Sequence, residues 1–533
     1  MDTDCARGTS DFTHTKLHSV SQRIEWKTVA LFFVVMLACT LVGVFCHTVV
    51  VPGEARHVGI VHDMWAARQY LVPRVNGLPA LDGAPLHYWI SLVFIGVFGV
   101  SEWVVRLPSV LAAALTLGML VRAWSPWLPP RSAGTLFILF LIQPALVVAA
   151  RFASPDMLNV LLFTVSVHGF MNAAHRVEQR RPARARTLGA WMACGLLALS
   201  AGPLAAVVPV SAVAMWLILR RRFAVLGELC WLPGPLACLA VVLPWLLIAE
   251  NRYPGIVHVF FKKDLQSLWG LRPFGWVEMG GQAYAALVVA GVLPLAACLY
   301  RLRDPARRQW LNTPVAGLMA VCFAVLLPMH PLVMSTLVGP AAVLALPLLF
   351  FGVLALAPVQ RPARRSDLLV WLLHVALLVV VGVAGSHYIV KRVSGLSPLV
   401  QSISQRYHAT NDKVVLLDRF DYEFNFYMRS PKLVYVVSDW NDAGRSMPVW
   451  KADLYDAARF APDAASRLLL SHDELLEKLC ERRVVNLWLI GDRQSVERHP
   501  ILLEMSALHG PDGSRAWYLE AATHLAACQQ QPD

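Results

Sequence analysis

The sequence contains few charged residues for its length. Only 15% of its 533 residues are charged, whereas 57% are hydrophobic. A soluble domain carries about 25% charged residues, so this chain has too few to cover a soluble surface of its size. The composition therefore excludes a soluble globular enzyme, a disordered scaffold and a collagen-like rod. It indicates a membrane protein that crosses the bilayer several times and contacts membrane lipids.

Motifs for metals, cofactors and nucleic acids are also missing. The sequence has no CxxC pair and no cluster of cysteines and histidines, so we expect neither a metal site nor a cofactor. It has no basic stripe with interleaved aromatics, so the net charge of +12 indicates basic cytoplasmic loops and no nucleic-acid partner. Cys480 and Cys528 lie in a polar segment, and the sequence leaves open whether they pair.

Long apolar runs are what the sequence does contain. A membrane helix needs about 20 mostly apolar residues, and the first such run extends from Trp26 to Val51. It follows a polar, basic N-terminus and has no small-residue cleavage site, which predicts an anchor and not a signal peptide. Further runs lie near 105–124, 132–151, 156–174, 188–203, 204–220, 228–249, 283–300, 312–329, 331–358 and 368–390. Together they predict about 11–13 transmembrane helices.

Arginine-rich loops orient these spans. The loops near residues 176–186, 220–222, 301–308 and 361–365 all fall on one predicted side, which is the positive-inside pattern of cytoplasmic loops. The resulting organisation is a cytoplasmic N-terminus (1–28), a membrane domain (29–390) and an outer segment (391–533). Within the membrane domain, residues 52–104 form a first outer loop of interfacial helices and residues 251–281 form a second large outer loop.

The composition changes after Lys391, where charged residues return and the apolar runs shorten. The runs at 412–418, 432–439 and 484–492 have the length of buried strands. Residues 471–483 predict a helix, in which Ser471 and Glu474 form a capping box. Strands alternating with helices predict a small α/β domain on the outer side of a polytopic helical membrane protein.

Acidic residues on the predicted outer side are the first candidates for chemistry. Glu54, Asp82, Asp156 and Asp264 all fall there. Ionisable groups near the bilayer are costly, so they tend to face a cavity. Each of these acids alone is more often a solvated loop residue or an ion-pair partner. Several around one cavity could position and activate an acceptor.

The first outer loop resembles that of a known family. Residues 53–113 carry, in order, Glu54-Ala55-Arg56, Asn76-Gly77, Pro85-Leu86, Tyr88-Trp89, Phe98-Gly99 and Arg106-Leu107-Pro108. This order resembles lipid-linked glycosyltransferases of the GT-C type, in the branch of the bacterial lipid A aminoarabinose transferase and the protein mannosyltransferases. Residues 150–159 are similar to the family's second outer loop, with Asp156 at its acidic position.

The resemblance implies a transferase at the periplasmic face of the bacterial inner membrane. It would move a sugar, an amino sugar included, from undecaprenyl phosphate to lipid A or another envelope glycolipid, and so modify lipopolysaccharide and confer polymyxin resistance. Glu54, Asp82 and Asp156 would be its catalytic acids. Groups that bind substrate and stabilise the anionic leaving phosphate would be Arg56, Arg74, Tyr88, Lys262, Lys263 and Arg272.

Three departures from the family pattern leave alternatives open. Gly53 stands where the family has an acid, and Gly83 and Ala201 stand where it has lysines. One alternative is a protein O-glycosyltransferase of the mannosyltransferase kind. Another is a relative that has lost catalysis and acts as a membrane scaffold or transporter. The sequence decides neither the sugar nor the acceptor.

Overall fold

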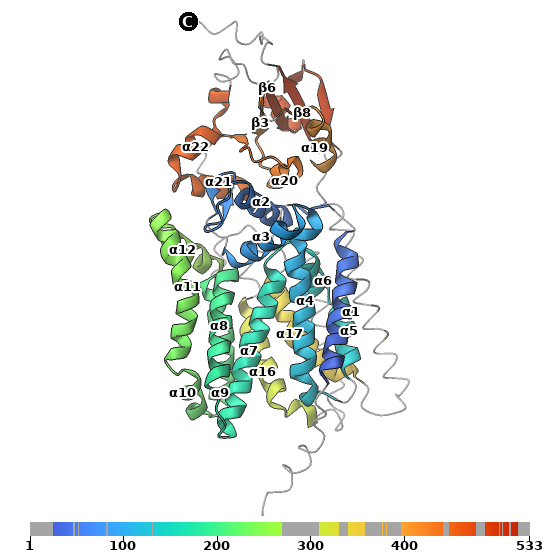
Figure 1. Cartoon of the computed structure of the whole chain (residues 1–533), viewed down its shortest axis with the longest axis vertical. Helices are drawn as coiled ribbons and strands as arrows, with labels where there is room; N and C mark the ends of the chain where they lie inside the picture. The colour runs from blue at the N-terminus through green and yellow to red at the C-terminus, as the bar shows by residue number, and fades with distance from the viewer. Residues whose placement is uncertain are drawn as a thin grey trace, which may run out of the picture.

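The computed structural model consists of three layers along its long axis: a helical bundle, a thin layer of helices across one end of it, and an α/β domain above that layer (Figure 1). The structure describes residues 25–268, 309–329, 339–357 and 396–520, and three isolated positions between 372 and 380. Short breaks within these ranges lie at 46–47, 52, 81–83, 130–131, 409, 441–446, 476–485, 500–501, 504 and 511–512.

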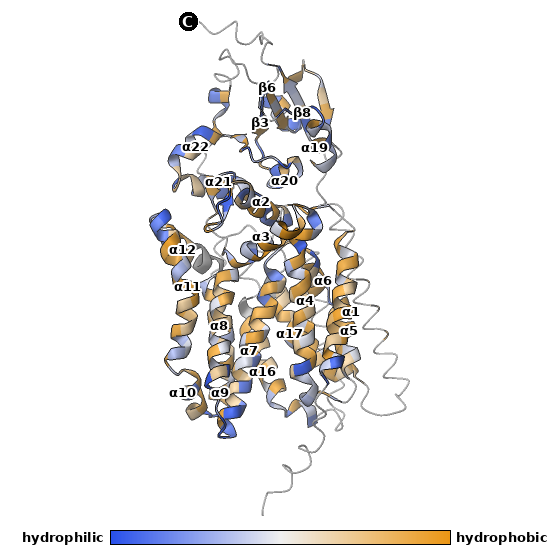
Figure 2. Ribbon diagram, in the orientation of Figure 1, coloured by the Kyte–Doolittle hydropathy of each residue, from blue (hydrophilic) through white to orange (hydrophobic). Residues whose placement is uncertain are grey.

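Apolar helices form the bundle. Its members include α1 (Trp26–Val44), α4 (Glu102–Trp124), α5 (Ser132–Ile142), α6 (Pro144–Arg151), α7 (Asp156–Glu178), α8 (Arg184–Ala201), α9 (Pro203–Leu219), α11 (Pro233–Arg252), α16 (Pro314–Met329) and α17 (Gly339–Leu356). Among the described residues, α1, α4, α7 and α11 are each long and apolar enough to cross a membrane. Figure 2 shows hydrophobic residues along the bundle helices and more hydrophilic ones at their ends. The chain is therefore a multi-pass membrane protein.

Two predicted spans differ from the observed helices. The first run was expected to reach Val51, but α1 ends at Val44. The run at 132–151 is not one helix: α5 and α6 meet at a bend of 69°. Pro144 is the first residue of α6, and its missing N–H and its ring prevent α5 from continuing. The runs at 283–300 and 368–390 lie almost wholly outside the described residues, so the full number of spans stays a prediction.

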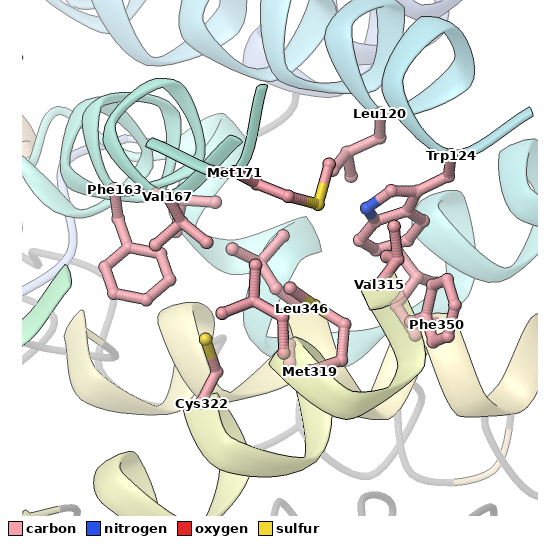
Figure 3. Packing of buried hydrophobic residues seen from close by; sticks show 14 of the residues in the cluster. Leu120, Trp124, Phe163, Val167, Met171, Val315, Met319, Cys322, Leu346 and Phe350 are labelled. Atoms are coloured by element: carbon pink, nitrogen blue, oxygen red, sulfur yellow. The ribbon is translucent and has the colours of Figure 1, made fainter. Parts of the chain in front are cut away.

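The bundle core is packed where α4, α7, α16 and α17 meet. The Trp124 ring packs edge-on against Phe350 with 5.1 Å between ring centroids, and Phe163 and Met319 belong to the same buried cluster (Figure 3). Trp124 also donates a hydrogen bond from Nε1 to His168 Nε2 at 2.6 Å, so its polar edge is satisfied inside the apolar core. This bond ties the end of α4 to the middle of α7.

Contacts at one end of the bundle test the predicted loop arrangement. Arg222, which follows α9, forms an ion pair with Glu178 at the end of α7, at 3.5 Å. The Trp127 ring, just after α4, stacks on His175 with 5.4 Å between centroids. The arginine-rich loops near 176–186 and 220–222 thus share one end, opposite the α/β domain (Figure 1). The loops near 301–308 and 361–365 lie outside the described residues.

The middle layer consists of α2 (Gly53–Ala66), α3 (Leu86–Phe98) and a hairpin of β1 (Arg74–Val75) and β2 (Leu78–Pro79). Both helices lie across the end of the bundle (Figure 1), as expected for interfacial helices. The hairpin turn is Asn76-Gly77, with φ of 47° and 76°. Two successive positive φ values are what a tight two-residue hairpin turn requires, and Asn-Gly is the pair that adopts them most readily.

The C-terminal domain is a six-stranded sheet in the order β5-β4-β3-β6-β8-β7. Strands β3 (Asp412–Leu417), β4 (Tyr435–Val437), β5 (Leu469–Leu470) and β6 (Asn486–Gly491) pair in parallel, and β8 (Arg515–Leu519) and β7 (Ala507–His509) add antiparallel edges. Its helices include α19 (Leu396–Ser404), α20 (Phe424–Met428), α21 (Val449–Ala458), α22 (Pro462–Leu468) and α24 (Arg493–Arg498). The predicted α/β fold is confirmed.

The three predicted strands are present as β3, β4 and β6, whereas β5, β7 and β8 were not predicted. The capping box at Ser471 is also present. The Ser471 backbone N–H donates to Glu474 Oε2 at 2.7 Å, and the Glu474 N–H donates to Ser471 Oγ at 3.2 Å. The helix that begins there is described as far as residue 475, so its predicted end at 483 lies outside the described residues.

One buried ion pair joins the middle layer to the bundle. Glu54 on α2 and Arg106 on α4 have fully buried side chains, and Arg106 donates from Nε to Glu54 Oε1 at 2.7 Å and from a terminal nitrogen to Oε2 at 2.9 Å. Arg106 also donates to the carbonyl of Val44, the last residue of α1, at 2.8 Å. A bidentate pair of this kind is strong and directional, so it sets how α2 crosses the bundle.

Side-chain and backbone contacts join the C-terminal domain to the middle layer and the bundle. Asn76 pairs its side-chain amide with the Val434 backbone, donating to the carbonyl at 2.8 Å and accepting from the N–H at 3.0 Å. Tyr427 donates to Glu102 at 2.7 Å and accepts from the backbone of Val49 at 3.0 Å. Burial raises the pKa of Tyr427, which keeps its phenol protonated as a donor. Further contacts are Arg56 with Asp453 at 2.9 Å, and Gly59 against the Tyr422 carbonyl.

We expect Arg106→Met to lower the stability of the protein by about 3–5 kcal/mol, because the Glu54 carboxylate would stay buried without its cation. Thermal unfolding of the purified protein in detergent measures the loss. Arg493→Met is the control: Arg493 pairs with Glu497, but the two side chains are 87% and 67% exposed. The double variant Glu54→Gln/Arg106→Met should be more stable than Arg106→Met alone. Equal losses of stability in Arg106→Met and Arg493→Met would contradict the importance that we assign to the buried ion pair.

We expect Gly59→Ala to loosen the C-terminal domain from the middle layer. A Cβ at this position would overlap the Tyr422 carbonyl oxygen, which is backbone and cannot rotate away. Limited proteolysis should then cut the chain between the bundle and the domain faster than in the unchanged protein. Gly134→Ala, on α5, is the matched control, because nothing lies within 4 Å of its added methyl. Equal cleavage rates for both variants would show that the approach at Gly59 is not needed.

Candidate active site

The candidate acids lie at the joint between the middle layer and the bundle. Glu54 is the second residue of α2, and both of its carboxylate oxygens are occupied. Besides Arg106, Oε1 accepts the backbone N–H of Ala153 at 2.9 Å, and Oε2 accepts that of Val50 at 3.0 Å. Four N–H donors therefore converge on one carboxylate, which holds it in one position.

Asp156 is the first residue of α7 and is fully buried. The Ser154 hydroxyl donates to its Oδ2 at 3.1 Å. The Ser154 carbonyl in turn accepts the Ser109 hydroxyl of α4 at 3.1 Å. A carboxylate in the first turn of a helix is stabilised by the exposed backbone N–H groups there. Asp156 is therefore held by the helix start and by the segment just before it.

The structure brings Glu54 and Asp156 to the same short segment of chain. Glu54 binds the N–H of Ala153, and Asp156 follows three residues later, bonded to Ser154. They differ in position: Glu54 is the second residue of α2, whereas Asp156 is the first residue of α7. Asp82, the third candidate acid, lies outside the described residues.

A cluster of aromatic and imidazole rings lies between α2 and α3. His57 Nδ1 and the Tyr88 hydroxyl are 3.0 Å apart, and the His87 ring lies 6.0 Å from that of His57. His87 is buried, and neither of its ring nitrogens has a hydrogen-bond partner among the described residues. Burial lowers the pKa of His87 to about 3, so this ring is neutral. Tyr88, a candidate substrate-binding residue, is itself buried here and contacts His57.

The candidate basic residues that the structure describes come from three different elements: α2, the hairpin and α12. Arg56 points to the C-terminal domain, where it pairs with Asp453. Arg74 lies in the hairpin and binds Gln69 and the Gly77 carbonyl, the latter at 2.6 Å. Lys262 is exposed on α12 (Ile256–Leu268), which follows α11 at the outer end of the bundle (Figure 1). Lys263 is on the same helix, and the structure describes only its backbone. Arg272 lies outside the described residues.

Several residues that build the site were not predicted as members of it. Arg106, Glu102, Tyr427 and Asp453 all form the contacts that position α2 and its neighbours. The available signal was Arg106: an arginine inside a long apolar run needs a buried partner of opposite charge. Among the described residues, no three His, Cys, Asp or Glu side chains lie together in a way that could hold a metal ion.

Comparisons with known proteins agree with this architecture. Residues 82–248 match the family model described as dolichyl-phosphate-mannose-protein mannosyltransferase. Two curated relatives are undecaprenyl phosphate-alpha-4-amino-4-deoxy-L-arabinose arabinosyl transferases. That of Edwardsiella ictaluri is 29% identical over 44% of this chain and 42% of its own, and that of Pseudomonas aeruginosa is 27% identical over 54% and 52%. The match thus spans about half the length of these relatives.

Two solved structures resemble the whole fold. The ArnT protein of Cupriavidus metallidurans, solved with bound undecaprenyl phosphate, superposes with a TM-score of 0.72 at 18% identity, over 95% of this chain and 99% of its own. The oligosaccharyltransferase of Archaeoglobus fulgidus gives 0.51 at 12% identity, over 90% and 70%. Residues 82–248 therefore match the dolichyl-phosphate-mannose-protein mannosyltransferase family model, and the chain is distantly similar to the aminoarabinose transferases and has the fold of ArnT.

Proposed function

We propose that the protein is a glycosyltransferase that takes a sugar from a polyprenyl phosphate, specifically undecaprenyl phosphate, and passes it to lipid A or another envelope glycolipid. The observation that carries this proposal is the position of Asp156. It is a buried carboxylate at the outer end of α7, beneath the C-terminal domain, and it lies within the residues that match the family. The names of the relatives and the undecaprenyl phosphate bound to ArnT support the donor class.

We assign to Asp156 the task of orienting and activating the acceptor. A carboxylate held at a helix start can orient an acceptor hydroxyl and take its proton. If the acceptor is a phosphate, its second pKa near 6 leaves it mostly dianionic at neutral pH, and positioning dominates. Glu54 has a different task in this proposal, because Arg106 and two backbone N–H groups occupy its oxygens. It is a positioning residue that fixes α2 and the 152–156 segment.

The leaving group calls for positive charge on the outer side. A polyprenyl phosphate becomes more anionic as the sugar departs, so basic side chains lower the barrier. Lys262 is exposed on α12 and is available for such contacts, and Lys263 and Arg272 follow it in the sequence. Arg56 and Arg74, both in the middle layer, are further proposed substrate-binding residues. Asp82 stays a proposed third acid in the loop before α3. The active site would face the periplasm of a bacterial inner membrane.

A second candidate function rests on the family departures. Gly53, at the start of α2, has no side chain where the family has an acid, and neither Gly83 nor Ala201 has a charged side chain where it has lysines. These changes remove charged groups that the family pattern contains. They favour a relative that has lost catalysis, and they also fit a changed acceptor such as a protein hydroxyl. A comparison of the products made by the unchanged protein with those made by Asp156→Asn distinguishes between these two possibilities.

The test is mass spectrometry of lipid A from cells with and without this gene. A sugar-sized mass increase that depends on the gene is the expected result. Asp156→Asn should lower that modification at least about 100-fold, because a general base typically contributes 10²–10⁴-fold and the substitution removes charge at constant shape. Membrane insertion should not change.

Asp463→Asn is the matched control, because Asp463 lies on α22 in the C-terminal domain and is exposed. It should leave the modification unchanged. Full modification by Asp156→Asn would remove this residue from the mechanism. Unmodified lipid A in both strains would reject lipid A as the acceptor, and a glycosylated protein found instead would support the protein O-glycosyltransferase.

The orientation in the membrane is a separate prediction. The arginine-rich loops near 176–186 and 220–222 share the end opposite the C-terminal domain, and positive loops stay in the cytoplasm. A reporter that is active only in the periplasm should therefore be active when fused at residue 400 and inactive when fused at residue 221. The opposite pattern would place the C-terminal domain and Asp156 on the cytoplasmic side.

A further inference from the structure

The C-terminal domain contains a cavity of about 300 Å³ at the amino ends of strands β3 and β4. Its polar lining consists of Tyr407, Lys413, Asn425, Ser430, Lys432 and Tyr435. Pockets that hold small molecules begin at about this size. No function described so far involves this cavity, and it shares no lining residue with the Glu54 and Asp156 region.

The charge of the cavity is positive. Lys413 and Lys432 line it, and none of the described lining residues is acidic. Lys413 Nζ donates to the Tyr435 hydroxyl at 2.9 Å, and Lys432 Nζ makes a long contact of 3.5 Å with a backbone carbonyl. An ammonium has three donors, so these bonds leave both lysines with capacity for an anion.

The carboxylate of Asp412, which precedes Lys413 in the chain, is engaged elsewhere. Asp412 is fully buried and accepts hydrogen bonds from the His408 backbone at 2.9 Å, the Asn486 side chain at 2.9 Å and the Trp488 ring at 3.2 Å. These three donors engage both of its oxygens, and Asp412 is not among the residues that line the cavity. The lysines therefore have no carboxylate from this residue in the cavity to neutralise them.

A buried amide adds an independent indication of a ligand. Asn425 is only 8% exposed, and its Oδ1 has no hydrogen-bond partner among the described residues. Leaving a buried acceptor unpaired costs about 1–3 kcal/mol, so such groups are rare unless a ligand or water satisfies them. The walls beside Asn425 are aromatic and apolar, formed by Phe424, Met428 and the ring of Tyr435.

We propose that this cavity binds a phosphorylated saccharide. Two ammonium groups match a phosphate, the amide and hydroxyl groups match sugar hydroxyls, and the aromatic walls can cover the apolar face of a sugar ring. The rim residue Leu433 contacts Gly77, and Val434 pairs with Asn76, so the cavity lies where the domain meets the hairpin of the middle layer. We assign it to the phosphorylated headgroup of the acceptor, and that assignment alone rests on the proposed function.

Binding of glucosamine 1-phosphate to the full-length protein in detergent tests the proposal by calorimetry, without turnover. The compound should bind at least tenfold more tightly than glucosamine and than inorganic phosphate, and added NaCl should weaken it. Lys413→Met/Lys432→Met should weaken binding at least tenfold, and Lys413→Arg/Lys432→Arg should retain most of it. Arg467→Met is the control, because Arg467 is exposed on α22 next to the cavity but does not line it.

The outcomes of this experiment test binding in the cavity independently of the transfer reaction. Equal binding of the three compounds, or unchanged binding in Lys413→Met/Lys432→Met, would overturn the proposal even if sugar transfer is confirmed. Binding that is lost in Lys413→Met/Lys432→Met and kept in Arg467→Met would support it even if no transfer is found. Thermal unfolding of each variant shows whether a loss of binding reflects a loss of fold. In that case, Asn425→Leu decides: it should weaken binding of the saccharide phosphate more than binding of inorganic phosphate, and an equal effect would overturn the saccharide assignment.

Discussion

The ion pair of Glu54 and Arg106 is the interaction on which the outer half of the molecule depends. It is buried at the point where α1 ends, α2 begins and α4 enters the bundle, and its atoms also bind the backbone of Val44, Val50 and Ala153. A buried charge pair is not stabilising in itself compared with apolar packing, but removing one partner is costly. Its effect here is to allow only one arrangement of these chain segments.

This arrangement connects the pair to both candidate regions. The Glu54 bond to Ala153 places the segment that leads into Asp156 and α7. The same helix, α2, carries Arg56 and Gly59, through which the C-terminal domain rests on the middle layer. A change at the pair would therefore shift the carboxylate at the bundle and the domain above it together.

The proposed division of roles between the acids starts from the surroundings of Glu54. Its carboxylate accepts four N–H groups of the protein, which ties it to the scaffold, whereas Asp156 begins α7 and accepts a hydrogen bond from Ser154. The absent side chains at Gly53 and Gly83 place more of the proposed chemistry on Asp156 and on positioning. The cavity lined by Lys413 and Lys432 adds a second region of positive charge, which lies in the C-terminal domain.

The sequence by itself determined the class of the protein, the long spans and the α/β character of the C-terminal domain. These features depend on hydrophobicity and spacing along the chain, and spans such as 156–174 are long, mostly apolar runs. Local chemistry was readable too: Ser471 and Glu474 cap a helix because their side chains reach only neighbouring backbone groups. The Asn76-Gly77 pair lies in the sequence motif that resembles the family, and in the structure it forms the hairpin turn.

Only the tertiary structure decided the partners of the charged residues. Glu54 and Arg106 are 52 positions apart, Asn76 and Val434 are 358 apart, and Arg56 and Asp453 are 397 apart, and no local pattern links any of these pairs. The short strands β5, β7 and β8 were likewise missed, because a strand of two to five residues becomes recognisable only through its pairing. The four N–H donors around the Glu54 carboxylate were likewise brought there by folding, which is a matter of distances in space and not of spacing in the chain.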